Sequence, residues 1–368
     1  MSKKSIQHLS LACFVSSHGF GHASRVAAVI HSLSLKVEKI DLFIFGDTPA
    51  WFWNANLPTH GCTHSLFPLQ TDVGLIQKSP FEHDLEQTYR QVLDFLTFSS
   101  PEIDSARTTL KKLQPQLALC DISPLGINLS KELGIPVILQ ENFTWDWIYK
   151  EYENEISGFS EIRNSLSQIY AKVDLRVHCS PCCHPTPLWP EVNPIFRPPT
   201  LSPLETKKRL GLGASEEFAL VTTGGIPMNH LAHQNSEIVL LIPGNFRELK
   251  REGKILYLPM NCGVPFTSLV NAACLVVGKA GYGTISECWG TDTPFLAVFR
   301  DSFRESDILR KYCEENLFSK EIPLETFIDG SWLELARQLK SAKKKALTSE
   351  NGSGQVAELI LEFHQKIL

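Results

Sequence analysis

Two successive rounds of alternating strand and helix patterns are the feature that most constrains the fold of this chain. In the first round, the apolar runs at 11–16, 42–45 and 117–120 are followed by segments with apolar residues at helical spacing. The pattern stops in a proline-rich segment from Ser180 to Pro203 and restarts with the apolar run at 218–222. Strands that alternate with helices indicate a parallel sheet with helices on both faces. The sequence therefore predicts two α/β domains joined by a semi-rigid linker.

The expected segments are an N-terminal domain at 1–180, a linker at 181–204, a second domain at 205–350 and a final helix at 351–368. A length of 368 residues fits two domains. The last helix, from about Gln355 to Ile367, carries an apolar stripe wider than one exposed helix needs. We therefore expect this helix to cross back and pack on the N-terminal domain.

Composition excludes several classes of partner. With 35 basic and 40 acidic residues, the net charge of −5 does not favour nucleic acid or an anionic membrane. No run approaches the roughly 18 to 20 apolar residues that span a bilayer, and no signal-peptide pattern follows the basic start. A cytoplasmic protein with reduced cysteines is expected. The Cys/His cluster from His178 to His184 matches no standard zinc spacing, so no metal site is expected. Four cysteines lie in apolar patterns and are expected in the core: Cys13, Cys120, Cys274 and Cys288.

The stretch from Gly278 to Glu287 follows the apolar run 275–277 and is expected to form a turn and then a helix from about Thr284. Gly281 and Gly283 are expected to allow positive φ and the close approach of an oxyanion. A helix N-terminus attracts anions, and Glu287 one turn later could accept hydrogen bonds from vicinal hydroxyls. Phosphate beside diol indicates a nucleotide or nucleotide-sugar pocket. A plain connection between strand and helix is the alternative.

Two further strand ends in the second half carry candidate ligand contacts. Thr223, Gly224 and Gly225 follow a strand and could share one diphosphate with the turn at 281–283, although an ordinary β-turn explains them as well. The segment 300–305 follows another strand and has charged residues that suit sugar hydroxyls, with a solvated loop face as the alternative. The expected donor-binding residues are Thr223, Gly224, Gly225, Gly281, Tyr282, Gly283, Thr284 and Glu287.

The first strand ends in a loop with two histidines. His22 stands at the start of a helix, where a neutral imidazole could act as a general base. Asp121, after another strand end, is the best-placed residue to orient it. Arg25 could pair with a carboxylate or reach a phosphate, and His18 suits a supporting hydrogen bond. Loop histidines bonded to the backbone are the alternative. We expect His22 and Asp121 to be catalytic.

An aromatic segment at 142–149 follows the strand at 137–139 and suits a carbohydrate platform. Packing of Trp147 and Tyr149 in the domain core is an equally good explanation. The expected substrate-binding residues are His18, Gly21, Arg25, Asn142, Trp145, Asp301, Arg304 and Glu305.

Taken in order along the chain, these blocks resemble glycosyltransferases of the GT-B architecture, which has two facing Rossmann-like domains. The segment from His18 to Arg25 resembles the glycine–histidine loop of that superfamily, and Lys279 to Glu287 resembles its donor-binding turn and helix. The wider pattern, with 142–149, 293–295 and 300–305, is most similar to the glycosyltransferase-like domain of plant arabinokinases and of stand-alone bacterial proteins.

The resemblance implies metal-independent transfer of a hexosyl or pentosyl group from a nucleotide-activated donor, expected to be a UDP-sugar, with no cofactor. The roles it implies are a base (His22), phosphate contacts (Gly281, Gly283, Thr284) and a ribose contact (Glu287). The helix N-terminus and side chains would stabilise the leaving diphosphate. The usual Asp-Gln or Glu-Gln sugar contact is replaced by a stretch with Asp301, Arg304 and Glu305. A non-catalytic nucleotide-sugar-binding module and a sugar-nucleotide epimerase are the alternatives.

Overall fold

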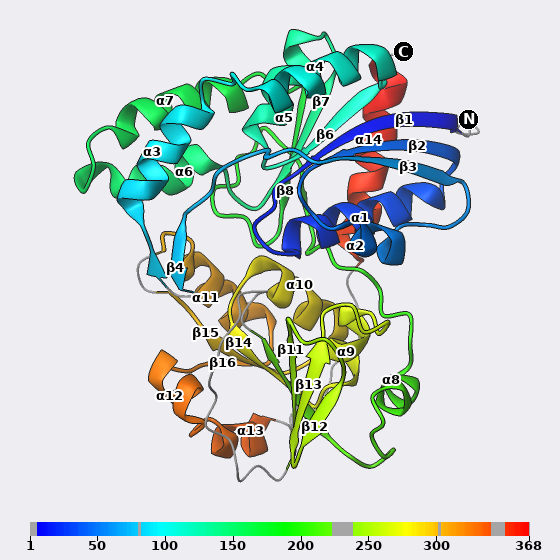
Figure 1. The fold of residues 1–368 in the computed structure, drawn as a ribbon, viewed down its shortest axis with the longest axis vertical. Coiled ribbons are helices and arrows are strands. Elements are labelled where there is room, and N and C mark those ends of the chain that lie inside the picture. Colours follow the sequence, from blue (N-terminus) through cyan, green and yellow to red (C-terminus); the bar gives the residue numbers. More distant parts are fainter. Residues whose placement is uncertain (1–5, 80–81, 223–237, 301–302, 340–349, 368) are drawn as a thin grey trace. The chain divides into compact units, whose positions relative to one another are not determined.

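The structure, a computed structural model, describes residues 6–79, 82–222, 238–300, 303–339 and 350–367. The chain divides into two compact units, the first made of residues 1–78, 83–195 and 350–368 and the second of 79–82 and 196–349. Each unit is built on a seven-stranded sheet (Figure 1). The predicted pair of Rossmann-like α/β domains is confirmed.

The first sheet is parallel throughout and has the order β3-β2-β1-β6-β7-β8-β9. Chain order reverses between β1 and β6, and the carboxyl ends of strands at such a switch point are where open α/β sheets bind ligands. The strands are β1 (Ile6–Val15), β2 (Val37–Phe45), β3 (Cys62–Phe67), β6 (Leu117–Asp121), β7 (Val137–Glu141), β8 (Leu175–Cys179) and β9 (Glu191–Val192).

Helices cover both faces of this sheet because the side chains of its buried strands alternate between two apolar layers. Cys13 and Val15 on β1 pack with α1 and α14, whereas Phe14 between them faces α5. Helix α5 approaches closely because Gly126 has no side chain: a Cβ there would lie 2.4 Å from the Phe14 ring. The helices are α1 (Gly21–Ser34), α2 (Ala50–Asn56), α3 (Leu85–Phe95), α4 (Pro101–Leu113), α5 (Pro124–Glu132), α6 (Trp145–Tyr149), α7 (Phe159–Tyr170) and α14 (Gly352–Ile367), with a 3-10 turn at Lys150–Asn154.

The second sheet repeats this arrangement with the order β12-β13-β11-β10-β14-β15-β16, antiparallel only at its β12 edge. Its switch point lies between β10 and β14. The strands are β10 (Phe218–Thr222), β11 (Val239–Gly244), β12 (Lys250–Glu252), β13 (Ile255–Pro259), β14 (Leu275–Lys279), β15 (Phe295–Val298) and β16 (Ser319–Glu321). The helices are α8 (Pro203–Arg209), α9 (Phe266–Ala272), α10 (Tyr282–Thr291), α11 (Ser306–Asn316), α12 (Leu324–Asp329) and α13 (Leu333–Leu339). A separate two-stranded sheet joins β4 (Gln77–Ser79) to β5 (Glu82–His83).

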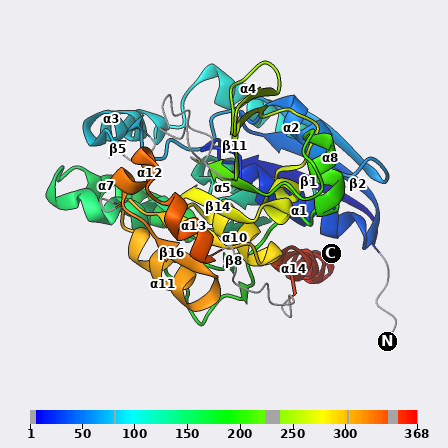
Figure 2. The ribbon, with the colours of Figure 1, turned by 90° about the horizontal axis from the view of Figure 1, so that it is seen from below.

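The C-terminal helix belongs to the first unit, as the sequence predicted. Figure 2 shows α14 beside α1, and the two helices are in contact. Val356, Ala357 and Ile360 of α14 join the core that α1 and β1 build. The Ser32 hydroxyl donates to the Ser353 hydroxyl at 2.9 Å. The backbone N–H of Asn193 donates to the side-chain oxygen of Gln355 at 2.9 Å. The apolar stripe of α14 is therefore explained by burial against α1 and the adjacent sheet.

Some local expectations differ from the structure. The proline-rich segment is not wholly linker, because β9 within it pairs with β8 at the sheet edge, where proline neighbours are tolerated. Helix α13 ends at Leu339, and residues 340–349 lie outside the described ranges. The segment boundaries at 180, 204 and 350 stay predictions.

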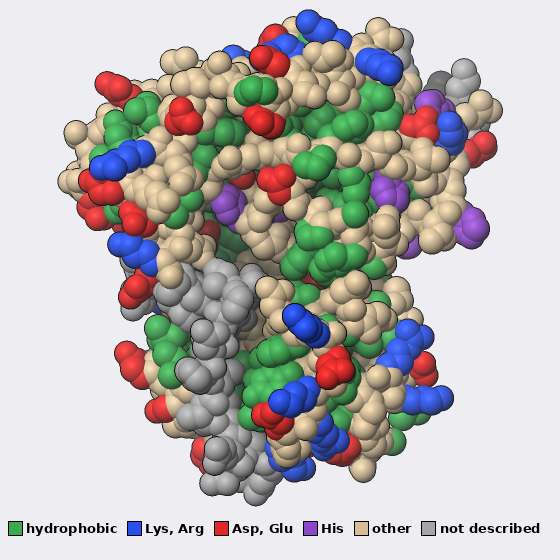
Figure 3. Space-filling model, viewed as in Figure 1, with side chains coloured by type: hydrophobic (Ala, Val, Ile, Leu, Met, Phe, Trp, Pro, Cys, Tyr) green, Lys and Arg blue, Asp and Glu red, His purple; other side chains and the backbone are tan. Residues whose placement is uncertain are grey.

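Basic and acidic side chains are interspersed on the face seen in Figure 3, and neither sign forms a broad patch among the described residues of that face. Of the helices in the described ranges, none has the length and apolar character that crossing a membrane requires.

Candidate functional site

The switch point of the first sheet brings His22 and Asp121 together. β1 ends at Val15, β6 ends at Asp121, and these two residues are register partners. Helix α1 begins at Gly21, so His22 lies in its first turn and Arg25 lies three residues later on the same face. Both predicted catalytic residues therefore lie where a doubly wound sheet binds its ligands.

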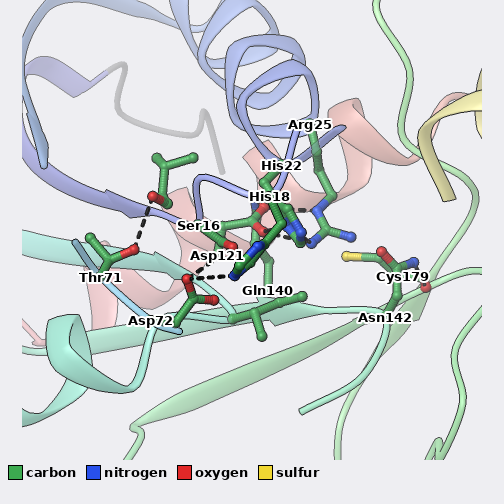
Figure 4. A network of polar contacts seen from close by, with 12 residues as sticks. Ser16, His18, His22, Arg25, Thr71, Asp72, Asp121, Gln140, Asn142 and Cys179 are labelled. Carbon is green, nitrogen blue, oxygen red and sulfur yellow. Dashed lines mark hydrogen bonds and ion pairs between the residues drawn. The ribbon is translucent and has the colours of Figure 1, made fainter. Parts of the chain in front are cut away.

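His22, Arg25 and Asp121 form one hydrogen-bonded group (Figure 4). His22 Nδ1 lies 2.7 Å from Asp121 Oδ1. Arg25 donates from Nη2 to the same oxygen at 2.6 Å and from Nε to Oδ2 at 2.8 Å, which is the bidentate arrangement of a strong ion pair. Of the two roles that the sequence allowed for Arg25, the structure has the pairing with a carboxylate.

The environment of Asp121 keeps it ionised. Its side chain is fully buried, and the Gln140 side-chain amide donates to Oδ2 at 2.7 Å. Burial by itself acts to raise the pKa of Asp121, but the Arg25 charge and the hydrogen bonds from Arg25 and His22 outweigh burial and hold this pKa below its usual value. Because an ionised carboxylate only accepts hydrogen bonds, His22 Nδ1 is the donor, which leaves Nε2 as the ring nitrogen that could accept a proton from a substrate.

A second histidine–carboxylate pair, which the sequence did not predict, lies in the same network. Asp72 is buried, accepts from Ser16 Oγ at 3.1 Å and from Trp145 Nε1 at 2.8 Å, and its Oδ1 lies 3.4 Å from His18 Nε2. Burial acts to raise the pKa of Asp72. The charge of His18 and the hydrogen bonds from His18 and Trp145 outweigh burial, so the pKa of Asp72 is lowered overall. The signal for Asp72 was weak, because β3 was not predicted and its following loop was therefore not recognised as a strand end.

The other substrate-binding candidates of the first unit have partners within the protein. The Asn142 amide donates to the Cys179 and Pro181 carbonyl oxygens at 2.6 and 3.0 Å. Trp145 is buried against Asp72, and Tyr149 is buried and donates to the Gly74 carbonyl oxygen. Of the two residues in the core explanation, Tyr149 is buried and Trp147 is half-buried, while Trp145, which was expected to bind substrate, is buried as well. Gly21 is the first residue of α1.

In the second unit, β14 ends at Lys279 and α10 begins at Tyr282, two residues earlier than expected. The expected positive φ at Gly281 and Gly283 is wrong. Gly281 has φ −116° as the N-cap, and Gly283 lies inside α10. The positive φ belongs to Gly278, at 148°, where a Cβ would lie 1.7 Å from the Thr222 carbonyl oxygen of β10. The close approach that requires glycine is thus between two strands at the switch point.

Among the described residues, the position beside Gly281 at the α10 N-terminus is unfilled. A Cβ built at Gly281 meets no atom within 4 Å. Tyr282, Gly283 and Thr284 form the first turn of α10, whose backbone N–H groups lack partners inside the helix. The predicted donor-phosphate residues on this helix are therefore placed together, although their contact with a phosphate stays a prediction.

Glu287 lies one turn into α10 and is nearly fully buried. Burial raises the pKa of its carboxyl to about 7, and the charge of Arg197, whose Nη2 lies 3.8 Å from Oε1, opposes this rise. Arg197 was not predicted as a site residue because it lies in the proline-rich segment. The pair links the start of the second unit to the helix that carries the candidate donor site.

Lys279 and Arg300 are charged residues at neighbouring strand ends, in two of the segments expected to contact the donor. Burial and the nearby Arg300 charge lower the pKa of Lys279 to about 7, while the Glu305 charge opposes this shift. Arg300 donates to Glu305 at 2.7 Å, so one expected sugar contact has a partner in the protein. Arg304 is partly buried, and Thr223, Gly224, Gly225 and Asp301 lie outside the described residues.

The two histidines of the Cys/His cluster lie beside a buried carboxylate. His178 Nδ1 lies 3.1 Å from Oε1 of the fully buried Glu141, and Arg176 Nε lies 3.7 Å from the same oxygen. His184 Nε2 lies 3.9 Å from the other carboxylate oxygen, Oε2. Within the described ranges, no group of three His, Cys, Asp or Glu side chains is arranged to hold a metal ion, and all ten cysteines are free.

Comparisons with known proteins place this geometry in a structural class. No protein-family model matches the chain. The chain is 24% identical over 367 residues to L-arabinokinase of Arabidopsis thaliana, a match that covers 97% of this chain but 34% of that protein. The chain therefore spans about a third of the length of this relative and is distantly homologous to that part of it.

Solved glycosyltransferases share the fold over nearly their whole length. A UDP-glucosyltransferase from Polygonum tinctorium matches with a TM-score of 0.59 at 13% identity, covering 99% of this chain and 100% of its own. The glycotransferase of kitacinnamycin matches with a TM-score of 0.61 at 14% identity, covering 97% and 99%. The SsfS6 glycosyltransferase of Streptomyces sp. SF2575 matches with a TM-score of 0.56 at 12% identity, covering 96% and 99%. The chain has the GT-B glycosyltransferase fold.

Proposed function

We propose that this protein transfers a sugar from a nucleotide-activated donor to a hydroxyl group of an acceptor, without a metal ion. The main support is the His22–Asp121 pair at 2.7 Å, held at the switch point of the first sheet by Arg25 and Gln140. A fixed imidazole with one nitrogen bonded to a buried carboxylate is suited to removing the proton of an attacking hydroxyl. The hydroxyl oxygen then bonds to the anomeric carbon of the donor as the nucleoside diphosphate leaves.

The donor diphosphate is proposed to bind at the N-terminus of α10, with contacts to Gly281, Gly283 and Thr284, and Glu287 is proposed to bind the ribose. Support comes from the room beside Gly281, where a Cβ would meet no atom of the described residues within 4 Å, and from the N-terminus of α10, whose dipole attracts anions. Lys279 adds a cation at the adjoining strand end, where negative charge develops on the leaving group. We propose UDP as the nucleotide. We also propose a reducing cytoplasmic location, because none of the ten cysteines is in a disulfide.

A non-catalytic nucleotide-sugar-binding module is the second candidate. This candidate is supported by the distant homologue, which is named for kinase activity. The match to this chain covers only about a third of the homologue's own length. On that proposal, the second unit binds nucleotide while His22 has no chemical role.

One panel of measurements separates the two proposals. Thermal shifts with UDP, dTDP, GDP and their sugar derivatives identify the donor, because a ligand that binds only the folded state raises its stability. Release of nucleoside diphosphate from the best donor, as its sugar passes to water or to an added polyol such as myo-inositol, is then measured for the wild type and His22→Ala. Transferase function predicts release that His22→Ala suppresses. Binding with equal, negligible release from both proteins supports the binding module, and no nucleotide binding rejects both proposals.

A further inference from the structure

We propose that His18, anchored by Asp72, forms a second acceptor-binding position beside His22, and that the acceptor is a polyhydroxylated molecule such as a sugar or cyclic polyol. The acceptor would present one hydroxyl to each histidine. This inference rests on the proposed transferase function and specifies the substrate class of its acceptor side.

The first observation is the carboxylate behind His18. The Asp72 side chain is 1% exposed, and a buried carboxylate is tolerated only with enough donors around it. Ser16 Oγ and Trp145 Nε1 donate to its two oxygens, and His18 Nε2 lies 3.4 Å from Oδ1. Three groups from two segments of the first unit, the loop after β1 and helix α6, therefore converge on one carboxylate.

The second observation is that His18 is held in place although it is exposed. About a third of its side chain, 34%, reaches the surface, compared with 14% for His22. A Cβ at Gly74 would lie 2.1 Å from His18 Nε2, so the backbone of this glycine packs directly against the ring. Tyr149 donates to the Gly74 carbonyl oxygen at 2.8 Å, and the His18 and Trp145 rings form a T-shaped contact with their centroids 5.6 Å apart. A surface histidine held on several sides is preorganised to bind a ligand.

The third observation is the parallel between the two histidines. Each has one ring nitrogen at a buried carboxylate. Both histidines also affect the pKa of Asp72, so both rings lie near that carboxylate (Figure 4). A monohydroxyl acceptor would use only one of these rings. A molecule with neighbouring hydroxyls would use both, because each imidazole can form one hydrogen bond with a hydroxyl.

The charges favour a neutral polyol over an anionic acceptor. Arg25 neutralises Asp121 through two hydrogen bonds, whereas Asp72 has no guanidinium or ammonium partner among the contacts above. The three side chains Arg25, Asp72 and Asp121 together carry one net negative charge. A phosphate or carboxylate on the acceptor would be repelled by that charge.

The test is a binding experiment that needs neither donor nor turnover. The whole protein, with ¹⁵N-labelled histidine, is titrated with myo-inositol, cis-1,2-cyclohexanediol and cyclohexanol, three molecules with the same six-membered ring. We expect saturable shifts of both His18 and His22 with the diol and myo-inositol. Binding of the diol should be about three- to tenfold tighter than that of cyclohexanol, the contribution of one neutral hydrogen bond.

His18→Ala should remove the preference for the diol, and His18→Gln should retain part of it because its amide can still donate to Asp72. His60→Ala, at an exposed turn residue, is the matched control and should keep the full preference. Equal affinity for diol and monohydroxyl ring, or movement of the His22 signal alone, would overturn the inference. Nucleotide binding is measured separately by thermal shift. Failure of the diol titration with intact UDP binding rejects this inference, whereas the reverse result rejects the proposed donor.

Discussion

At the residue scale, the chemistry of the first unit depends on how two carboxylates are compensated. Asp121 has an arginine, a glutamine and a histidine as partners, and Asp72 has a serine, a tryptophan and a histidine. The difference is the guanidinium, which makes Asp121 the centre of a buried ion pair. A buried ion pair is strongly destabilised when one partner is removed, because the remaining charge has no compensation.

His22→Ala should lower turnover by roughly 10²- to 10⁴-fold, the usual contribution of a positioned general base. Nucleotide affinity should barely change, because the candidate donor residues lie in the other unit. His18→Ala should cost less turnover, since a supporting hydrogen bond contributes less than proton transfer. Single-turnover transfer in the two variants decides the assignment. If His18→Ala is inactive while His22→Ala is active, His18 is the base.

Asp121→Ala should lower the free energy of unfolding by about 3–5 kcal/mol, because Arg25 is left buried without its carboxylate. Urea denaturation followed by circular dichroism measures this change. The matched control is Glu358→Ala, which breaks the exposed pair between Lys36 and Glu358 and should have a much smaller effect. An equal loss in both variants would show that the Arg25–Asp121 pair contributes no more than a surface pair.

Lys279 should make nucleotide affinity depend on pH. With its pKa lowered to about 7, Lys279 is a cation below that pH and loses its charge above it. Affinity for a nucleoside diphosphate should therefore fall as the pH rises from 6 to 8. Lys279→Met should bind more weakly at pH 6 and lose most of this dependence. Calorimetry at the two pH values tests this, and an unchanged pH dependence in Lys279→Met would place the diphosphate elsewhere.

At the element scale, α14 shows how a distant segment of the sequence completes a core. Its buried residues recur at helical spacing, and they meet α1, β8 and β9 of the first unit. The contact is both apolar and polar, since Lys36 also pairs with Glu358 at 2.9 Å. The first unit therefore requires the end of the chain for its core.

Ile360→Ala should lower the free energy of unfolding by about 2–5 kcal/mol, the range for removing a fully buried aliphatic side chain. Gln365→Ala, at an exposed position of the same helix, should change stability by less than about 0.5 kcal/mol. Chemical denaturation of the two variants separates core packing from helix propensity. A small effect at Ile360 would mean that α14 can leave the first unit at little cost.

At the scale of the whole molecule, each unit has its own sheet and its own apolar clusters. We expect two transitions in thermal denaturation, because separate cores can lose their packing separately. Ile360→Ala should lower the transition of the first unit. A nucleotide at about 100 times its Kd should stabilise the second by about 2.7 kcal/mol. Calorimetric scanning measures both shifts, and a single transition moved by both changes would show that the units unfold together.

The sequence alone determined the two rounds of α/β alternation, the contact of the last helix with the first domain, and the meeting of His22 with Asp121. These follow from local patterns, because apolar periodicity defines strands and helices, and parallel strands put their carboxyl ends at one edge. The tertiary structure decided which residues compensate the buried charges. The roles of Asp72, Gln140 and Arg197 could be recognised only in the folded structure. Their partners lie far away in the sequence, and no local sequence pattern encodes a long-range contact. It also showed that positive φ occurs at Gly278 and not at Gly281 or Gly283. The reason is the close approach of the Thr222 carbonyl oxygen, on a neighbouring strand, to Gly278.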